Sequence, residues 1–128
     1  MFDSTHIPTR AECIALCQAA VHDGAQWSYA GPEFNLNLLV WSAGHGIEQH
    51  RNHELDVVLL GVVGFGEVTL NGMAHRLVSG GMLVVPRGAT RSLRATSARW
   101  GYLSVHQPRA GLLSLVDRRA QASAPQAM

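Results

Sequence analysis

The chain has 128 residues, the length of one domain, and 47% of them are hydrophobic, which is enough for a packed core and argues against wholesale disorder. The formal net charge is only +1, and no basic stripe interleaved with aromatic residues accompanies it. The composition therefore argues against a nucleic-acid partner.

The N-terminal segment, Met1 to Arg10, lacks the charged and then apolar layout of a signal peptide. No apolar run in the chain is long enough to cross a bilayer as a helix. We therefore expect a cytoplasmic protein that has no membrane partner.

The first predicted element is an amphipathic helix from about Arg10 to His22. Thr9 and Glu12 have the spacing of a capping box, and Gly24 marks the end. Its apolar residues recur at helical spacing: Cys13, Leu16, Cys17, Ala20 and Val21. Such a stripe must cover another apolar surface.

Both cysteines of the chain, Cys13 and Cys17, lie four residues apart on this helix. The spacing is compatible with a redox-active pair, with half of a metal site, or with two small residues that face the core. We favour the core-facing interpretation.

From Phe34 onward the hydrophobic period becomes that of strands. The stretch from Leu55 to Val63 is apolar on both faces except at Asp56, so we expect this strand to be covered on both sides. Asn71 and Gly72 form the strongest short hairpin signal. Further strands are predicted over 82–85 and 100–106. Many short strands with regular turns indicate a sandwich or a small barrel.

The predicted organisation is a single domain over residues 1–128. It comprises a helical segment over 1–24, a barrel core over about 34–106, and a loose tail over 117–128. The apolar residues between Gly111 and Val116 are predicted to pack on the domain.

Residues 46–61 read GIEQHRNHELDVVLLG, and residues 80–91 read GGMLVVPRGATR. These two segments resemble the motifs of the cupin superfamily. In cupins the first motif has two histidines, a glutamate and a glycine that ends the strand, and the second has glycines, a proline and a histidine. The resemblance implies an all-β fold, a cupin-type double-stranded β-helix (jelly-roll barrel), with a short N-terminal helix. It is weaker as an indicator of function.

The resemblance also implies positions for metal ligands. His50 and Glu54 stand where cupins keep a histidine and a glutamate, whereas Glu48 replaces the first histidine and Arg91 replaces the histidine of the second motif. A cupin metal site would therefore consist of Glu48, His50 and Glu54 around a divalent ion such as Fe, Mn, Zn or Ni. The cation at Arg91 argues against this site.

Strand alternation predicts a common face for the carboxylates of Glu54 and Asp56, and a row of Leu55, Val57 and Leu59 on the opposite face. If the carboxylates point into the barrel, they need a partner, because a buried carboxylate is costly when it is unpaired. We expect Arg91 to contact one of the two, Glu54 or Asp56. The apolar row then faces outward and must be covered, so we expect a homodimer, with the N-terminal helix as the competing cover.

Three functions follow as hypotheses. The first is a barrel that binds a small polar or carboxylated metabolite through Arg91, Asp56, His50 and Glu54. The second is a metal-dependent cupin enzyme of the dioxygenase or isomerase type that uses Glu48, His50 and Glu54. The third is a structural domain that forms a homodimer.

Overall fold

The structure, a computed structural model, describes residues 7–108, and this part of the chain forms one helix and nine strands. Helix α1 spans Arg10–Ala19. The strands are β1 (Gly24–Ala30), β2 (Asn35–Ser42), β3 (Gly46–Arg51), β4 (Val57–Val63), β5 (Phe65–Leu70), β6 (Met73–Val78), β7 (Met82–Val85), β8 (Thr90–Ala95) and β9 (Arg99–His106).

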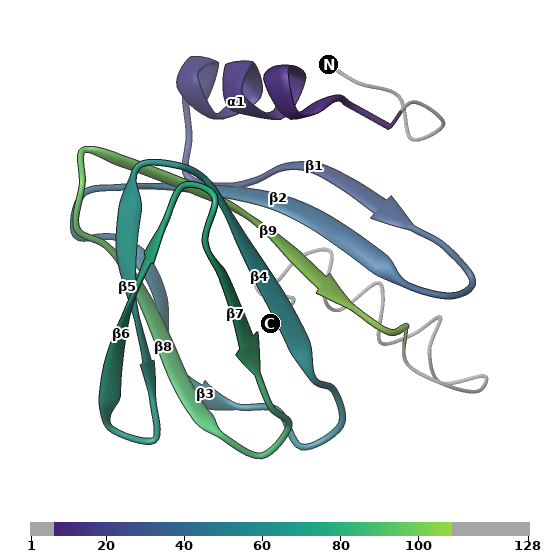
Figure 1. Cartoon of the computed structure of the whole chain (residues 1–128), viewed down its shortest axis with the longest axis vertical. Helices are drawn as coiled ribbons and strands as arrows, with labels where there is room; N and C mark the ends of the chain where they lie inside the picture. Colours follow the sequence, from purple (N-terminus) through teal and green to yellow (C-terminus); the bar gives the residue numbers. More distant parts are fainter. Residues whose placement is uncertain (1–6, 109–128) are drawn as a thin grey trace.

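The strands form two antiparallel sheets that face each other, with α1 on the outside (Figure 1). The first sheet, called sheet A here, has the order β1-β2-β9-β4-β7, and the second, sheet B, has the order β3-β8-β5-β6. This arrangement confirms the prediction of an all-β jelly-roll fold with a short N-terminal helix.

The barrel core lies between the inner faces of the two sheets. Alternation along β8 buries Leu93 and Ala95, and alternation along β9 buries Trp100 and Tyr102. The indole Nε1 of Trp41 donates a buried hydrogen bond of 2.9 Å to the Tyr102 hydroxyl, whose pKa is raised by burial. The buried members of this cluster are Leu39, Trp41, Val57, Leu59, Val68, Leu77, Val85, Leu93, Ala95, Trp100 and Tyr102.

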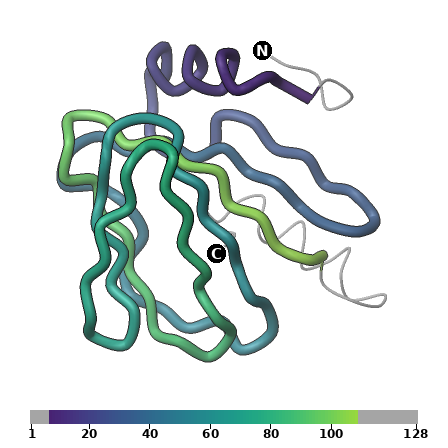
Figure 2. Tube along the Cα trace, viewed as in Figure 1, coloured from purple at the N-terminus to yellow at the C-terminus, as the bar shows by residue number. Residues whose placement is uncertain are grey.

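One end of the barrel is closed where the chain crosses between the sheets. Figure 2 shows β4 continuing into β5, and β8 into β9, at the upper left of the trace. At this end the backbone of Gly66 in β5 packs directly on the Trp100 ring from the opposite sheet, because a Cβ at Gly66 would overlap that ring.

The hairpin between β5 and β6 turns at Asn71 and Gly72, as predicted. Both residues have positive φ, 48° and 83°, which is the geometry that the tightest two-residue hairpin turns require.

Helix α1 covers the outer face of sheet A. The capping box is present, since Thr9 N donates to Glu12 Oε1 at 2.8 Å and Glu12 N donates to Thr9 Oγ1 at 3.2 Å. The helix buries Cys13 and Cys17 in a second apolar cluster with Trp27, Leu38, Val40 and Val62. The prediction of a helical stripe that covers an apolar surface is confirmed.

The helix ends at Ala19 and not near His22 as predicted. Ala20 already has an extended backbone, with φ −61° and ψ 131°. The last carbonyls of the helix are bound by Arg99, a residue of β9 that is remote in sequence. The sequence around the end of the helix therefore did not predict where it stops.

Both cysteine thiols are buried beneath the helix, which agrees with the core-facing interpretation. Burial raises the pKa of Cys17 to about 11 and also raises the pKa of Cys13. A raised pKa disfavours the thiolate, which is the reactive form in redox chemistry and in metal binding.

Two strand predictions were wrong in detail. Strand β1, which pairs along β2, is an additional strand that the sequence did not predict, because the regular alternation of apolar residues begins at Phe34. The row of Val57 and Leu59 faces the barrel core and not the exterior, and both side chains are 0% exposed. Asp56 alternates with these residues and therefore does not point inward.

Within the described residues, no helix is long and apolar enough to cross a membrane. The predictions for 111–116 and for the tail over 117–128 concern segments outside the described residues.

Candidate functional site

The candidate site begins with a buried arginine. Alternation along β8 points Arg91, like Leu93 and Ala95, into the barrel, and Arg91 is 0% exposed. Leu93 and Ala95 belong to the apolar core. Arg91 is the next inward-pointing residue of β8, and it lies on the side of this core that is away from the closed end of the barrel. Such burial is rare for a charged side chain, and among residues 7–108 no carboxylate forms an ion pair with Arg91.

The turn between β7 and β8 holds the Arg91 guanidinium in place. Its Nε donates to Ala89 O at 3.2 Å, and its Nη2 donates to Pro86 O at 3.0 Å. The third nitrogen, Nη1, is buried and has no hydrogen-bond partner among the described residues. Burial lowers the pKa of Arg91, and the charge of Asp56 opposes this effect. The guanidinium remains a cation at neutral pH.

Strand β9 adds polar groups on the facing sheet. Beyond Trp100 and Tyr102, the next inward positions are Ser104 and His106, which are 0% and 5% exposed. Ser104 Oγ is buried without a hydrogen-bond partner in the described part of the chain, and His106 Nδ1 lies 2.8 Å from Gln107 O. A buried polar atom that lacks a protein partner requires a water or a ligand.

The predicted ligand residues Glu54 and Asp56 do not point into the barrel. Both are exposed, because Val57 and Leu59 occupy the inward positions of β4. Asp56 Oδ1 accepts from Arg87 N at 2.8 Å and lies 3.6 Å from Arg87 Nε. The hydrogen bond from the Arg87 backbone holds the pKa of Asp56 below its usual value. Of the two pairings expected for Arg91, the one with Asp56 was therefore wrong, because Asp56 pairs with Arg87.

A β-bulge separates the two predicted ligands of β3. The register of β3 on β8 shifts between Ile47 and His50, so that Ile47 opposes Leu93 and His50 opposes Arg91. His50 is half-buried beside Arg91, and its Nδ1 lies 3.0 Å from Glu48 O. Glu48 lies inside the bulge and is exposed.

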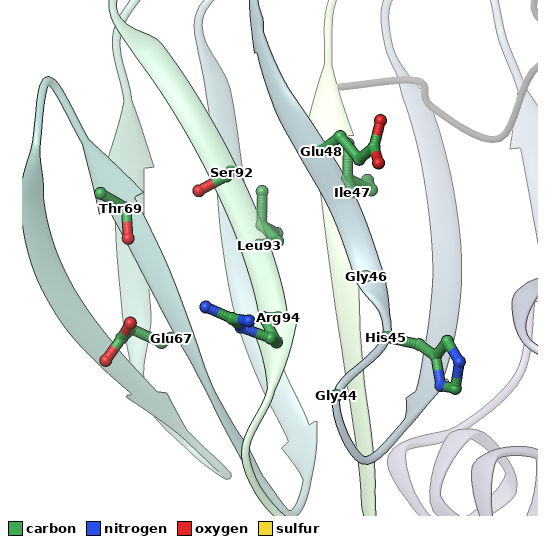
Figure 3. Close-up of a pocket in the computed structure, with 10 residues that line it drawn as sticks. All are labelled: Gly44, His45, Gly46, Ile47, Glu48, Glu67, Thr69, Ser92, Leu93 and Arg94. Atoms are coloured by element: carbon green, nitrogen blue, oxygen red, sulfur yellow. The ribbon is translucent and has the colours of Figure 1, made fainter.

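Glu48 instead lines a pocket of about 360 Å³ formed by β3, β5, β8 and the turn that precedes β3 (Figure 3). On the outer face of sheet B, Glu67 opposes Arg94 and Thr69 opposes Ser92. In Figure 3 the Arg94 side chain extends toward the strand that carries Glu67. All these side chains are half-buried or exposed, which is typical of a solvated sheet face.

The described residues do not fit a cupin metal site. Within residues 7–108, no three His, Cys, Asp or Glu side chains lie close enough together to hold a metal ion. The position of the second-motif ligand is occupied by Arg91, a fully buried cation, and Glu48 and Glu54 are exposed. The predicted set of Glu48, His50 and Glu54 therefore does not converge.

Sequence reasoning missed Ser104 as a site residue. The sequence shows that Ser104 lies on the same face of its strand as Trp100 and Tyr102. This alternation does not show whether the shared face points into the barrel or toward solvent. Only the burial of Trp100 and Tyr102 in the barrel core shows that this face points inward.

No family model and no curated protein matches this chain. Solved structures do match: KdgF from Halomonas sp. is 22% identical, with a TM-score of 0.61, and the alignment covers 66% of this chain and 77% of that one.

A cupin protein from Bacteroides fragilis is 21% identical, covers 74% of this chain and 84% of its own, and has a TM-score of 0.60. The cupin domain of Schizosaccharomyces pombe Cnp3 is 20% identical, covers 81% of this chain and 77% of its own, and has a TM-score of 0.61. At this identity the likeness concerns the fold. The chain therefore has the cupin fold that its two sequence motifs predicted.

Proposed function

We propose that the barrel binds a small carboxylated metabolite and that Arg91 is its anchor. The observation that carries this proposal is the buried guanidinium, whose Nη1 has no hydrogen-bond partner among the described residues. An anion at Nη1 would supply the charge that offsets the cost of burying a cation.

The geometry around Arg91 favours a ligand over a purely structural role. Its hydrogen bonds to described residues run to the carbonyls of Pro86 and Ala89, which orient the side chain without neutralising it. A carboxylate is the usual partner of a guanidinium, and such charge-assisted hydrogen bonds are about twice as strong as neutral ones. A side chain held in advance also loses less entropy when a ligand binds.

The proposed site differs from the one that the sequence predicted. It keeps Arg91 and its cross-strand neighbour His50, and it places Glu54 and Asp56 outside, since both are exposed. The alternative of a metal-dependent enzyme that uses Glu48, His50 and Glu54 lacks a geometric basis, because these side chains do not converge.

The test is a titration of the full chain with butyrate and with its uncharged analogue butyramide, followed by NMR of the ¹⁵N-labelled protein. We expect binding of butyrate and no binding of butyramide. Arg91→Met should weaken butyrate binding by about tenfold to a hundredfold, the value of one charge-assisted hydrogen bond.

The matched control is Arg94→Met on the same strand, since Arg94 is exposed on the opposite face of β8. It should leave the affinity for butyrate within about twofold of the parent. Arg91→Lys keeps a charge but has a single ammonium group, so we expect an intermediate affinity. Equal affinities of the parent and Arg91→Met, with both folded by circular dichroism, would contradict the proposal.

A homodimer remains the proposed assembly, but on a different face from the one predicted. On the outer face of sheet A, Val58 opposes Val84 and Leu60 opposes Met82. Val84 is 53% exposed and Met82 is 67% exposed on the edge strand β7, beside the part of the face that α1 covers. A second copy can bury such a patch through a twofold axis.

Light scattering after size exclusion at micromolar concentration should therefore give the mass of a dimer. The double substitution Met82→Glu and Val84→Glu should give a monomer, because it places charges in the apolar contact. Met73→Glu is the control, since Met73 is 65% exposed on β6 of the other sheet and should leave the dimer intact. A monomeric parent protein would refute this assembly.

A further inference from the structure

The turn between β7 and β8 carries the two carbonyls that hold the Arg91 guanidinium, those of Pro86 and Ala89. Ala89 N donates to Pro86 O at 3.3 Å, and Gly88 has the positive φ of 84° that a type II turn requires at its third residue. Pro86 O therefore accepts both from the backbone of the turn and from Arg91 Nη2. The orientation of the guanidinium thus depends on where this turn lies.

The central N–H groups of the turn are bound by the segment between β3 and β4. Asp56 Oδ1 accepts from Arg87 N at 2.8 Å and also lies 3.6 Å from Arg87 Nε. Asn52 O accepts from Gly88 N at 2.7 Å. Because both acceptors belong to this segment, a loss of either contact frees the turn that carries the carbonyls bound to Arg91.

Of these two contacts, only the one from Asp56 uses a side chain, so it can be removed by substitution. The charge of Asp56 also reaches the guanidinium, since it opposes the effect of burial on the pKa of Arg91. Asp56 can therefore act on Arg91 in two ways, through the position of the turn and through its charge.

We infer that Asp56 is a positioning residue of the Arg91 site, because its carboxylate fixes the turn whose carbonyls orient the guanidinium. This inference rests on the proposed function, in which the same guanidinium binds the ligand. A guanidinium that is held in advance binds an anion with a smaller loss of entropy. The negative charge of Asp56, in contrast, disfavours an anion at Arg91. The two effects have opposite signs, so neutral substitutions separate them.

The experiment compares Asp56→Asn with Asp56→Ala, each titrated with butyrate in the full chain and followed by NMR. Both substitutions remove the charge, but asparagine keeps an oxygen that can accept from Arg87 N. We expect Asp56→Asn to bind butyrate at least as tightly as the parent. Asp56→Ala should bind it about threefold to tenfold more weakly than Asp56→Asn, the net value of one hydrogen bond.

A second measurement follows the Arg91 side chain directly. Its Nε–H donates to Ala89 O, and the ¹⁵N signal of this group is identified by its absence in Arg91→Met. We expect this proton to exchange slowly with water in the parent and in Asp56→Asn, and faster in Asp56→Ala. A purely structural contribution of Asp56 would lower the stability toward urea and leave this signal unchanged.

Asp23→Ala is the matched control, because Asp23 Oδ1 also accepts from a backbone N–H, that of Ser42, at 3.0 Å. Ser42 pairs with Arg99, where β9 begins at the closed end of the barrel (Figure 2). This control should leave butyrate binding and the exchange of the Arg91 Nε–H as they are in the parent.

Equal butyrate affinities of Asp56→Asn and Asp56→Ala would overturn the inference, and so would equal exchange rates of the Arg91 Nε–H in the two variants. Either result would leave the proposed function standing. Failure of the parent to bind butyrate would instead refute the proposed function, and the exchange rates would then test only whether Asp56 holds the Arg91 side chain.

Discussion

Replacement of Gly66 by valine is expected to lower the free energy of unfolding by about 1–3 kcal/mol, the usual cost of overpacking a core. The Cβ of any residue at this position would overlap the Trp100 ring, which is itself 0% exposed. In the native protein the close contact between the Gly66 backbone and this ring joins the two sheets at the closed end of the barrel. Neither partner can move without separating β5 from β9.

The direction of the change in unfolding free energy shows whether tertiary packing or the strand propensity of the residue dominates at this position. Valine favours strands and glycine disfavours them, so the substitution would stabilise β5 if nothing packed on Gly66. Urea denaturation of the parent and the variant measures the difference. Thr69→Val is the control on the same strand, since Thr69 faces outward, and it should change stability by no more than about 0.5 kcal/mol. A Gly66→Val protein as stable as the parent would show that the sheets do not meet at this residue.

Arg99→Met is expected to release helix α1 from the barrel and to cost about 1.5–3 kcal/mol, the range for a hydrogen bond to a charged group. Arg99 Nη1 lies 2.8 Å from Cys17 O, 2.9 Å from Gln18 O and 2.9 Å from Ala20 O. The helix has no basic residue in its last turn, so Arg99 provides the positive charge that its C-terminus favours. Methionine keeps much of the apolar stem and removes the donors.

The release of the helix can be measured separately, by the rate at which a thiol reagent labels Cys17. Cys17 is 0% exposed under α1, so in the parent its thiol should react with a thiol reagent only after the helix opens. We expect labelling of native Arg99→Met to be faster than that of the parent. Arg94→Met is the control, because Arg94 is an exposed arginine of the neighbouring sheet. Equal labelling rates in the parent and Arg99→Met would contradict the role of Arg99 as a clamp.

Local features were predictable where neighbouring residues decide the structure. The capping box of Thr9 and Glu12 and the hairpin at Asn71 and Gly72 each depend on a few consecutive residues, and both are present as expected. The two motifs also predicted the fold. Their glycines and their proline describe turns, and turns set the order of strands in the sheets.

The site was less predictable because it depends on which face of each strand is buried. Strand β4 is apolar on both faces, so its sequence does not show whether Val57 or Val58 points inward. The choice of the wrong face placed Glu54 and Asp56 inside the barrel. In β3 the bulge between Ile47 and His50 interrupts the alternation, and strict alternation therefore cannot place Glu48.

By itself the sequence determined the class of fold, the N-terminal cap and the position of Arg91 in the second motif. Only the tertiary structure decided that Arg91 is buried with one nitrogen unbound by described residues, that Ser104 is buried on β9 of the other sheet, and that Arg99 holds α1. The reason is physical. Local patterns record what neighbours along the chain prefer, whereas the burial and pairing of a polar group depend on strands that meet only after folding.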